Sequence, residues 1–296
     1  MLQAIDWRIT HSCNNYCFYC YGNKPINRVS ISEEEILLKK IISSPVKMVN
    51  ITGGEPMLEP ERCFNIIKTL TAGGKSVYFS TNATNLEDNL DFIFENVDLL
   101  GLPLDGYDEL SNQINGRAQN SFALVKNVLE KNNCRNEKIN IKIGTVITKK
   151  NLDLKHLSKM CDLLTEQGIK VWRLYEMIPV NRGANNRDKL ELNDLDRVEL
   201  YNIICKLREL APNIKIEFAS RASRASAYFI IQPDGSVIVP IDSIDNTQEK
   251  IVGNLLTESF DEVYNKWKSV SGMENDTEYM QMRTADVVSK MSITFD

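Results

Sequence analysis

A short apolar run leads directly into three closely spaced cysteines near the start of the chain: AIDWRITHSCNNYCFYC, residues 4–20. The run Ala4–Thr10 predicts a β-strand, and the cysteines fall in the loop after it. Three thiolates this close together can ligate three irons of a four-iron cluster and leave the fourth iron open to a small molecule. A zinc site of four cysteines needs a second pair, but the other four are scattered singly: Cys63, Cys134, Cys161 and Cys205.

Strand-like runs alternate with helical patterns as far as Ile178. Ser32 is expected to cap the first helix, with Glu35 completing a capping box. Such alternation predicts an α/β fold with a parallel sheet covered by helices. Right-handed crossovers would wind six units into a partial (β/α)6 barrel, too few for a closed barrel, with function at the carboxyl ends of the strands. The expected strands are Ala4–Thr10, Val46–Thr52, Ser76–Thr81, Val97–Leu104, Ile139–Thr148 and Val171–Ile178, and the later helices are Glu59–Ala72, Leu86–Glu95, Ser121–Asn132 and Leu152–Glu166.

The pattern changes after Ile178, which predicts a core of residues 1–180 and a small α+β extension of residues 181–296 that caps the barrel. The turn Pro233-Asp234-Gly235 predicts a β-hairpin, because proline fixes φ and glycine accepts a positive φ. The elements expected in the extension are a helix at Asn193–Leu210, hairpin strands at Tyr228–Gln232 and Ser236–Pro240, and a helix at Thr257–Trp267.

The amino-acid composition argues against some classes of binding partner. Apolar residues make up 43% and charged residues 25% of the 296 residues, as in a soluble globular protein. The net charge of −5 gives no broad electrostatic basis for binding nucleic acid or an anionic membrane, so neither is expected as a partner. The sequence contains no apolar run long enough for a transmembrane helix. Seven cysteines without an export signal predict a cytoplasmic location and metal or redox use of some thiols.

A second motif, Thr52-Gly53-Gly54-Glu55-Pro56, ends the second expected strand. Glycines at a strand end let the backbone approach a ligand closely. The free amides and carbonyls there, with Glu55 nearby, are expected to grip an α-amino group.

Together, the two motifs resemble the signature of the radical S-adenosylmethionine (SAM) superfamily. The cysteines are separated by three and then two residues, an aromatic residue precedes the last one, and Gly-Gly-Glu-Pro follows one strand later. The resemblance covers about Ala4 to Ile178. It implies that Cys13, Cys17 and Cys20 hold a [4Fe–4S] cluster. The cluster, reduced by a donor such as flavodoxin or ferredoxin, would cleave SAM to methionine and a 5′-deoxyadenosyl radical that takes a hydrogen atom from a substrate.

The resemblance also implies a set of SAM-binding residues. Gly53, Gly54, Glu55 and Pro56 form the motif that grips the amino group, and Tyr19 lies against the adenine. No catalytic acid or base is assigned, because hydrogen-atom abstraction can proceed without one. The remaining expected contacts are Ser80 and Asn82 to the ribose or carboxylate, Arg117 to the methionine carboxylate, and Asn151 with the backbone near Met177 beside the adenosine.

Further polar residues are candidates for the site. Asp105 ends the fourth strand and is expected at the barrel mouth. Arg173 and Glu176, three apart on a strand, face opposite sides, and Glu176 is the better candidate because it is nearer the carboxyl end. His11 could tune the cluster, whereas His156 is expected to be structural. A group of arginines forms either a solvated surface or a pocket for a phosphate or carboxylate: Arg182, Arg187, Arg221 and Arg224.

Two branches of the superfamily resemble different parts of the chain. The stretch from Asp105 through Arg117 to Lys142 resembles viperin-like enzymes, which dehydrate nucleoside triphosphates, although Gly144-Thr145 replaces their asparagine-serine pair. The hairpin and Gly253-Asn254-Leu255 resemble SPASM and twitch enzymes, which modify peptides, other proteins or small molecules, but Ile241 stands where a cysteine usually holds an auxiliary cluster.

We therefore expect a radical SAM enzyme of lyase or oxidoreductase type with one cluster. The expected substrate is small and polar, a nucleotide or sugar derivative. The alternatives are a peptide- or protein-modifying enzyme, which predicts a precursor peptide encoded nearby, and a non-catalytic iron–sulfur or SAM-binding regulator, which predicts SAM binding without cleavage. Cys17→Ala is expected to abolish the cluster, and Gly54→Val to spare the cluster but weaken SAM binding.

Overall fold

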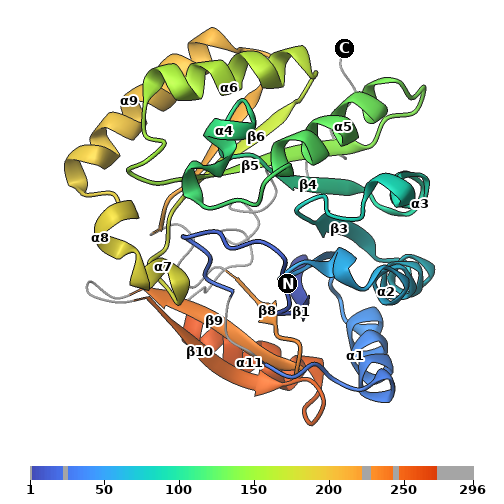
Figure 1. Ribbon diagram of the computed structural model, residues 1–296. Coiled ribbons are helices and arrows are strands. Elements are labelled where there is room, and N and C mark those ends of the chain that lie inside the picture. The colour runs from blue at the N-terminus through green and yellow to red at the C-terminus, as the bar shows by residue number, and fades with distance from the viewer. Residues whose placement is uncertain (1, 23–25, 222–227, 243–246, 272–296) are drawn as a thin grey trace.

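A single curved sheet runs through the protein, as shown by the computed structural model, which describes residues 2–22, 26–221, 228–242 and 247–271. Its ten strands lie in the order β10-β9-β8-β1-β2-β3-β4-β5-β6-β7. Strands β1 to β7 are parallel to their neighbours, and helices cover the outer face (Figure 1). The strands that begin the barrel are β1 (Ala4–Thr10), β2 (Met48–Gly53), β3 (Ser76–Ser80), β4 (Leu99–Pro103), β5 (Asn140–Ile147) and β6 (Val171–Glu176).

The helices follow the strands as the alternating pattern predicts. This arrangement confirms the α/β class and the parallel partial barrel. The main helices are α1 (Ile31–Ser43), α2 (Pro60–Ala72), α3 (Leu90–Asn96), α5 (Ser121–Asn133), α6 (Leu154–Glu166) and α9 (Asp194–Leu210). Shorter pieces are α4 (Glu109–Asn112), α7 (Arg182–Asn185), α8 (Arg187–Leu190) and the 3₁₀ turns η1 (Pro56–Leu58), η2 (Glu87–Asn89) and η3 (Gln113–Asn115). No helix in the described ranges is long and apolar enough to cross a bilayer.

The start of α1 differs from the prediction. Ser30, not Ser32, is the N-cap, and its partner in the capping box is Glu33, not Glu35. The helix therefore begins two residues earlier than expected. Glu34 is buried against Arg62 of α2, whose Nε donates to its carboxylate over 2.6 Å.

Two strands were not predicted. β7 (Lys215–Ala219) adds a seventh parallel strand beside β6, and β10 (Thr247–Asn254) pairs antiparallel with β9 (Ser236–Asp242). Lys215 and Glu217 interrupt the apolar pattern of β7, and pairing with β6 stabilises that strand despite its weak local pattern. The predicted hairpin is confirmed: β8 (Ile230–Ile231) pairs antiparallel with β9, and Gly235 in the turn has a φ of 79°.

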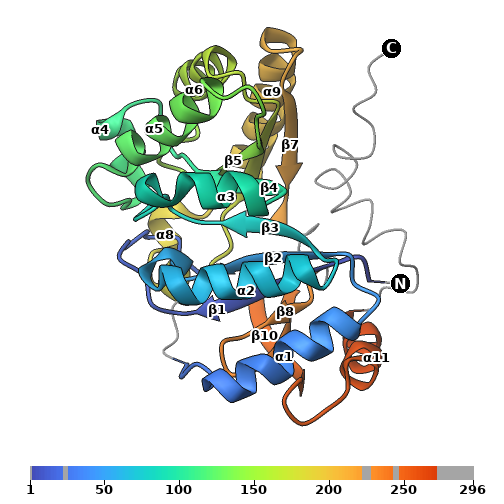
Figure 2. The same cartoon turned by 90° about the vertical axis from the view of Figure 1, so that its right-hand side faces the viewer.

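The C-terminal strands extend the barrel sheet itself. β8 pairs in parallel with β1, with Asp6 opposite Ile230, so the extension lies edge to edge with the barrel (Figures 1 and 2). Helix α11 (Phe260–Ser271) covers these strands, and Phe260 and Trp267 stack on Phe229 with ring centroids 5.5 and 5.9 Å apart. Because β7 and β8 join one sheet, the boundary predicted at residue 180 does not coincide with a break in that sheet.

Alternation along the strands separates two interiors. On β1, Ile5, Trp7 and Ile9 pack into the large apolar core under the helices, so Asp6 and Arg8 point to the other, concave face. Residues early on that face form a small apolar cluster that fills the amino end of the barrel: Ala4, Met48, Tyr78 and Leu99. Further along the strands the concave face carries polar side chains, such as Arg8 and Lys142, among apolar and aromatic ones, such as Val146 and Tyr175.

Candidate active site

The three cysteines line one chamber at the carboxyl ends of β1 to β5. We call this cavity of about 290 Å³ the cysteine chamber. The same chamber brings together most of the residues that the sequence analysis proposed for SAM binding. Those residues are Cys13, Cys17, Cys20, Tyr19, Gly53, Gly54, Ser80, Asn82 and Arg117.

The backbone around Gly53 and Gly54 is hydrogen-bonded to residues 10–12, which lead into the cysteine loop. The Gly54 N–H donates to the Thr10 carbonyl and the Glu55 N–H to the Ser12 carbonyl, each over 2.7 Å. A Cβ atom on Gly54 would lie 2.1 Å from the Ser12 carbonyl oxygen, and one on Gly53, where φ is +155°, would lie 2.3 Å from that of Thr10. The Gly54 and Glu55 amides were expected to be free to bind a ligand, but both donate hydrogen bonds within the protein. Contrary to the sequence analysis, this geometry predicts that Gly54→Val displaces the cysteine loop and does not spare the cluster.

The buried Glu55 side chain links the ends of β2 and β3 through hydrogen bonds. Its carboxylate accepts hydrogen bonds from the Thr81 hydroxyl and the Asn82 N–H, each over 2.6 Å, and from the Met57 N–H over 2.9 Å. Burial raises the pKa of Glu55 to about 7, although the three donors oppose that rise. Glu55 and the buried Pro56 are not among the residues that line the cysteine chamber. Their contact with SAM remains a prediction.

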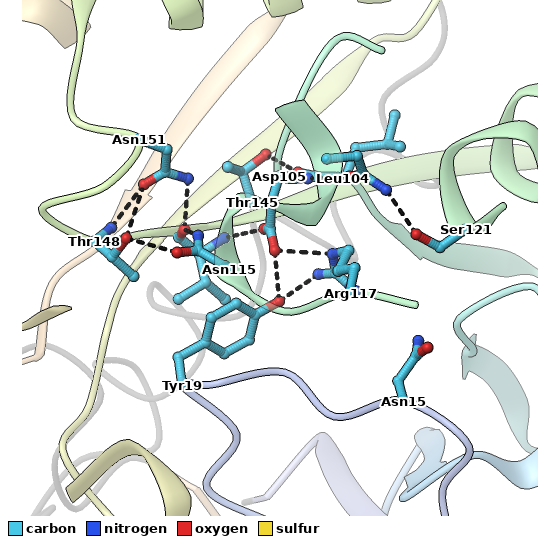
Figure 3. Close-up of polar contacts among 12 residues, drawn as sticks. Asn15, Tyr19, Leu104, Asp105, Asn115, Arg117, Ser121, Thr145, Thr148 and Asn151 are labelled. Atoms are coloured by element: carbon cyan, nitrogen blue, oxygen red, sulfur yellow. Dashed lines mark hydrogen bonds and ion pairs between the residues drawn. The ribbon is translucent and has the colours of Figure 1, made fainter. Parts of the chain in front are cut away.

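A buried triad joins the cysteine loop to β4 (Figure 3). Asp105 Oδ2 accepts from the Tyr19 hydroxyl and from Arg117 Nε, each over 2.8 Å, and Arg117 Nη2 donates to the Tyr19 oxygen over 2.5 Å. Asp105 Oδ1 accepts from the Val146 N–H over 3.1 Å. Burial raises the pKa of Tyr19 well above its usual value, so its hydroxyl stays protonated. Asp105, a candidate on sequence grounds, thus fixes both Tyr19 and Arg117.

The loop after β5 supports the cysteine loop from the other side (Figure 3). The Phe18 N–H donates to the Asn115 carbonyl over 2.8 Å, and the Asn115 side chain accepts from the Thr148 hydroxyl over 2.9 Å. Asn151 is fully buried; its amide accepts from the Thr148 N–H over 2.8 Å and donates to the Val146 carbonyl over 3.0 Å. Asn151 is not among the lining residues of the cysteine chamber, so its contact with adenosine remains a prediction.

A second cavity, also of about 290 Å³, continues from the first, and we call it the inner chamber. It adds Met177, a predicted site residue, and a wall from the C-terminal strands: Ile230, Pro240 and Glu249. The residues that line both chambers are Arg8, Tyr19, Cys20, Tyr21, Thr52, Tyr78, Ser80, Lys142, Val146 and Tyr175.

Three buried cations line the inner chamber, from three different strands. Arg8, Lys142 and Arg173 are 4%, 2% and 8% exposed. Arg8 donates to Glu249 over 3.1 Å, and the Lys142 ammonium lies 4.3 Å from the centre of the Tyr78 ring. Arg173 Nη1 lies 3.8 Å from a carboxylate oxygen of Glu217 on β7.

Arg173 and Glu176, the two candidates on β6, both line the inner chamber. Trp172 and Leu174 pack into the core under the helices, and Glu176 lies at the carboxyl end of the strand, at the chamber. Its carboxylate accepts from Arg197 of α9 over 2.7 Å and from the Arg221 N–H over 2.8 Å. Arg173 lies on the opposite, concave face of β6. The two residues do alternate in direction along β6, but both line the inner chamber, so the preference for Glu176 stays a prediction.

The predicted arginine pocket does not form among the described residues. Arg187 and Arg221 both pair with Glu191, and Arg221 does so over 2.8 Å. Arg182 lies 3.7 Å from the centre of the Tyr16 ring and donates to the Cys17 carbonyl over 3.2 Å. None of these three lines the inner chamber, and Arg224 lies outside the described residues. Arg8 was missed, although its place beside Asp6 in an otherwise apolar strand marks a polar concave face.

The two histidines make structural hydrogen bonds. His156 Nε2 lies 2.8 Å from the Asp105 carbonyl oxygen, which confirms its structural role. His11 Nε2 lies 2.8 Å from Gln232 Oε1, so it links the start of the cysteine loop to the hairpin.

Comparisons with known proteins agree on one family. The family model described as the radical SAM superfamily matches residues 7–187, more than half of the chain. The S-adenosylmethionine-dependent nucleotide dehydratase of Fibrobacter sp. (strain UWH6) is 30% identical over 191 residues, which cover 60% of this chain and 56% of that protein. Mycofactocin maturase MftC of Mycobacterium ulcerans is 25% identical over 204 residues, 67% of this chain and 54% of that protein. The chain thus spans little more than half the length of these two relatives.

Solved structures share the fold. Native anSMEcpe with bound AdoMet and Cp18Cys peptide has a TM-score of 0.69 at 16% identity, over 98% of this chain and 99% of that one. Streptococcus suis SuiB bound to S-adenosylmethionine has a TM-score of 0.66 at 15% identity, over 96% of this chain and 68% of that one. Both alignments extend through the C-terminal strands.

The cysteine chamber fits the family's cofactors. Three thiols on one loop open into a single cavity, and the other cysteines lie elsewhere: Cys63 and Cys161 are buried in helices, and Cys134 and Cys205 are exposed. Within the described residues, no three histidine, cysteine or acidic side chains gather around a single metal ion. In a cubane each thiolate has its own iron, so the thiols need not converge on one point. The chain belongs to the radical SAM superfamily, whose enzymes use a [4Fe–4S] cluster and S-adenosylmethionine.

Proposed function

We propose that this enzyme uses SAM to abstract a hydrogen atom from a phosphate-bearing small molecule, such as a nucleotide, in the inner chamber. One observation carries the proposal: the chamber lined by the three cysteines continues into one lined by the buried cations Lys142 and Arg173. A radical formed in the first chamber can therefore reach a substrate in the second without crossing solvent. Similarity to proteins named nucleotide dehydratases supports a substrate of this class.

In this proposal the loop cysteines hold the cluster and the surrounding residues orient SAM. The cofactors supply a 5′-deoxyadenosyl radical when bound. The Gly53 and Gly54 carbonyls bind the amino group of SAM, and Arg117 binds its carboxylate. Tyr19, held in place by Asp105, packs against the adenine. Ser80 and Asn82 border the ribose, Met177 closes the inner side, and Glu55, Pro56 and Asn151 hold the loops in place.

Lys142 and Arg173 bind the anionic group of the substrate. Lys142 is a compact buried ammonium, and the planar guanidinium of Arg173 suits bidentate contact with phosphate. Both lie on strands β5 and β6, whose residues Val146 and Tyr175 also line the junction between the chambers. The predicted core of residues 1–180 supplies these groups, and Tyr228, Ile230, Pro240 and Glu249 of the predicted extension complete the chamber wall.

The test is coupled turnover. Protein reconstituted anaerobically with iron and sulfide is reduced with dithionite, given SAM, and assayed by mass spectrometry for 5′-deoxyadenosine with and without each nucleoside triphosphate. At least one nucleotide is expected to raise 5′-deoxyadenosine formation and to be converted to a new product. Lys142→Ala should remove this stimulation while cluster content is retained, and Lys138→Ala, an exposed lysine outside both chambers, should behave as wild type.

The proposal fails if no nucleotide stimulates SAM cleavage, or if Lys142→Ala leaves the stimulation intact. Stimulation by a peptide encoded near the gene would instead establish the peptide-modifying class, which the full-length structural similarity to anSMEcpe and SuiB favours. SAM binding without any cleavage by the reduced, fully loaded protein would support the regulator.

The electron donor in this proposal is a flavodoxin or ferredoxin in the cytoplasm. Cys13 is exposed, so the cluster would lie close to the protein surface. Replacing dithionite with reduced flavodoxin should sustain turnover. Failure of both flavodoxin and ferredoxin to do so would contradict this part of the proposal.

A further inference from the structure

The C-terminal strands provide one wall of the inner chamber, and this wall carries a carboxylate. Along the sheet, Asp6 of β1 lies opposite Ile230 of β8, Ile230 opposite Ile238 of β9, and Pro240 of β9 opposite Glu249 of β10. Asp6, Ile230, Pro240 and Glu249 all line the chamber. The wall is therefore apolar in its centre and acidic at Glu249 and Asp6.

The described charges of the chamber are segregated. Asp6 and Glu249 lie at the β1–β10 side, and the one cation there, Arg8, is bound to Glu249 over 3.1 Å. Lys142 and Arg173 lie on β5 and β6, with Glu217 beside Arg173. Glu176 of β6 also lines the chamber and is paired with Arg197 over 2.7 Å. The β1–β10 side, which includes β8, and the β5–β6 side face each other across the curved sheet (Figures 1 and 2). Counted over these groups, the first wall has an excess of one negative charge and the second an excess of one positive charge.

Arg8 holds the acidic wall in position. Its guanidinium lies at the junction of the two chambers, 5.0 Å from the centre of the Tyr21 ring, and reaches Gln232 at 3.5 Å as well as Glu249. The Glu249 side chain is 15% exposed, so its position depends on this ion pair. Asp6 is fixed separately by Asn50, whose amide donates to it over 2.6 Å.

We infer that Asp6 and Glu249 select a substrate with an amino group at the end remote from its phosphate. The inference rests on the proposed function, because Lys142 and Arg173 must hold the phosphate for the other end to face the acidic wall. Ionised carboxylates only accept hydrogen bonds, so an amino group satisfies them. A carbonyl oxygen in the same place would meet like partial charges and lose its own hydrogen bond to water.

The experiment compares pairs of nucleotides that differ at one group. CTP and UTP, and likewise ATP and ITP, differ by an amino group in place of an oxo group, and the oxo base also carries a hydrogen on the neighbouring ring nitrogen. Affinities for the reconstituted protein with SAM are measured anaerobically by calorimetry. In at least one pair the amino nucleotide should bind about tenfold more tightly or better, the effect of one hydrogen bond to a charged group. Inorganic triphosphate measures binding at the cationic wall alone.

Variants assign the preference to the acidic wall. Glu249→Gln and Asp6→Asn should bring the amino-to-oxo affinity ratio towards one without weakening inorganic triphosphate binding. Asp261→Asn, an exposed carboxylate on α11, should keep the wild-type ratio. The wild-type ratio by itself remains decisive if a variant fails to fold.

The outcomes separate the inference from the proposed function. If neither inorganic triphosphate nor any nucleotide binds, the phosphate-bearing substrate class is wrong. If they bind with a ratio near one in both pairs, or if Glu249→Gln and Asp6→Asn both keep the wild-type ratio, the acidic wall does not select an amino group.

Discussion

The two chambers are built in opposite ways. The cysteine chamber draws most of its predicted residues from short contiguous segments: the loop of residues 13–20, the β2 end at 53–54 and the β3 end at 80–82. The inner chamber takes its charged side chains from strands far apart in the chain, including Asp6, Lys142, Arg173 and Glu249. The first therefore leaves motifs in the sequence, and the second leaves single residues separated by up to 243 positions.

The difference has a physical origin. A cluster and the polar end of SAM need many contacts from one place, and strand-end loops supply contiguous backbone groups for them. A substrate wall needs only side chains that point inward, and every second residue of a strand does so. Substitution of one motif residue should thus abolish the function of the cysteine chamber, whereas substitution of one residue of the inner chamber should change a single contact with the substrate.

The largest expected effect is that of Cys17→Ala. One cluster ligand is lost, so cluster assembly and all SAM cleavage should disappear, as judged by the visible absorption of the cluster and by 5′-deoxyadenosine. Cys205→Ala, on the exposed side of α9, should retain both. A Cys17→Ala protein that keeps the cluster spectrum and cleaves SAM would refute the ligand assignment.

Gly54→Ala tests whether the Gly-Gly-Glu-Pro motif holds the cysteine loop in position. The added Cβ would lie 2.1 Å from the Ser12 carbonyl oxygen, so the cysteine loop must shift and most of the iron bound after reconstitution should be lost. Gly22→Ala, where an added Cβ meets nothing within 4 Å, should bind iron normally. If Gly54→Ala retains full iron content and loses only SAM affinity, the motif acts on the ligand alone.

Asp105→Ala tests the triad that anchors Tyr19. It would leave the buried Arg117 without its ion pair and should cost about 3–5 kcal/mol in free energy of unfolding, measured by urea denaturation of the apoprotein. Asp91→Ala removes the carboxylate of a surface pair with Arg135 and should cost less than about 1 kcal/mol. Equal costs for the two variants would show that the triad adds no more than a surface pair.

Glu55 gives the smallest effect, and its sign depends on pH. Below pH 4.5 the carboxyl is protonated in both the folded and the unfolded chain; between 4.5 and about 7 only the unfolded chain has ionised. The free energy of unfolding of the wild type should therefore fall relative to Glu55→Gln as pH rises through this window, by up to about 3 kcal/mol at roughly 1.4 kcal/mol per unit. A difference that stays constant, or grows the other way, would show that the three donors outweigh burial.

Local patterns predicted much of the barrel. Strand β1 was placed at Ala4–Thr10 because its apolar run is bounded by a loop, and the hairpin because Pro233-Asp234-Gly235 favours a turn. Strands β7 and β10 were not predicted because charged residues interrupt their apolar patterns: Lys215 and Glu217 in β7, Glu249 and Lys250 in β10. Their place in the sheet depends on the neighbouring strand, which the local sequence does not encode.

The sequence by itself determined the family, because three cysteines and a glycine pair must sit close together in the chain to serve one cluster and one ligand. Only the tertiary structure decided which distant side chains share a cavity. It paired Glu176 with Arg197 of α9, Arg187 and Arg221 with Glu191, and Glu249 of β10 with Arg8 of β1. Those contacts arise from strand order and sheet curvature, which bring residues together across the barrel regardless of their distance along the chain.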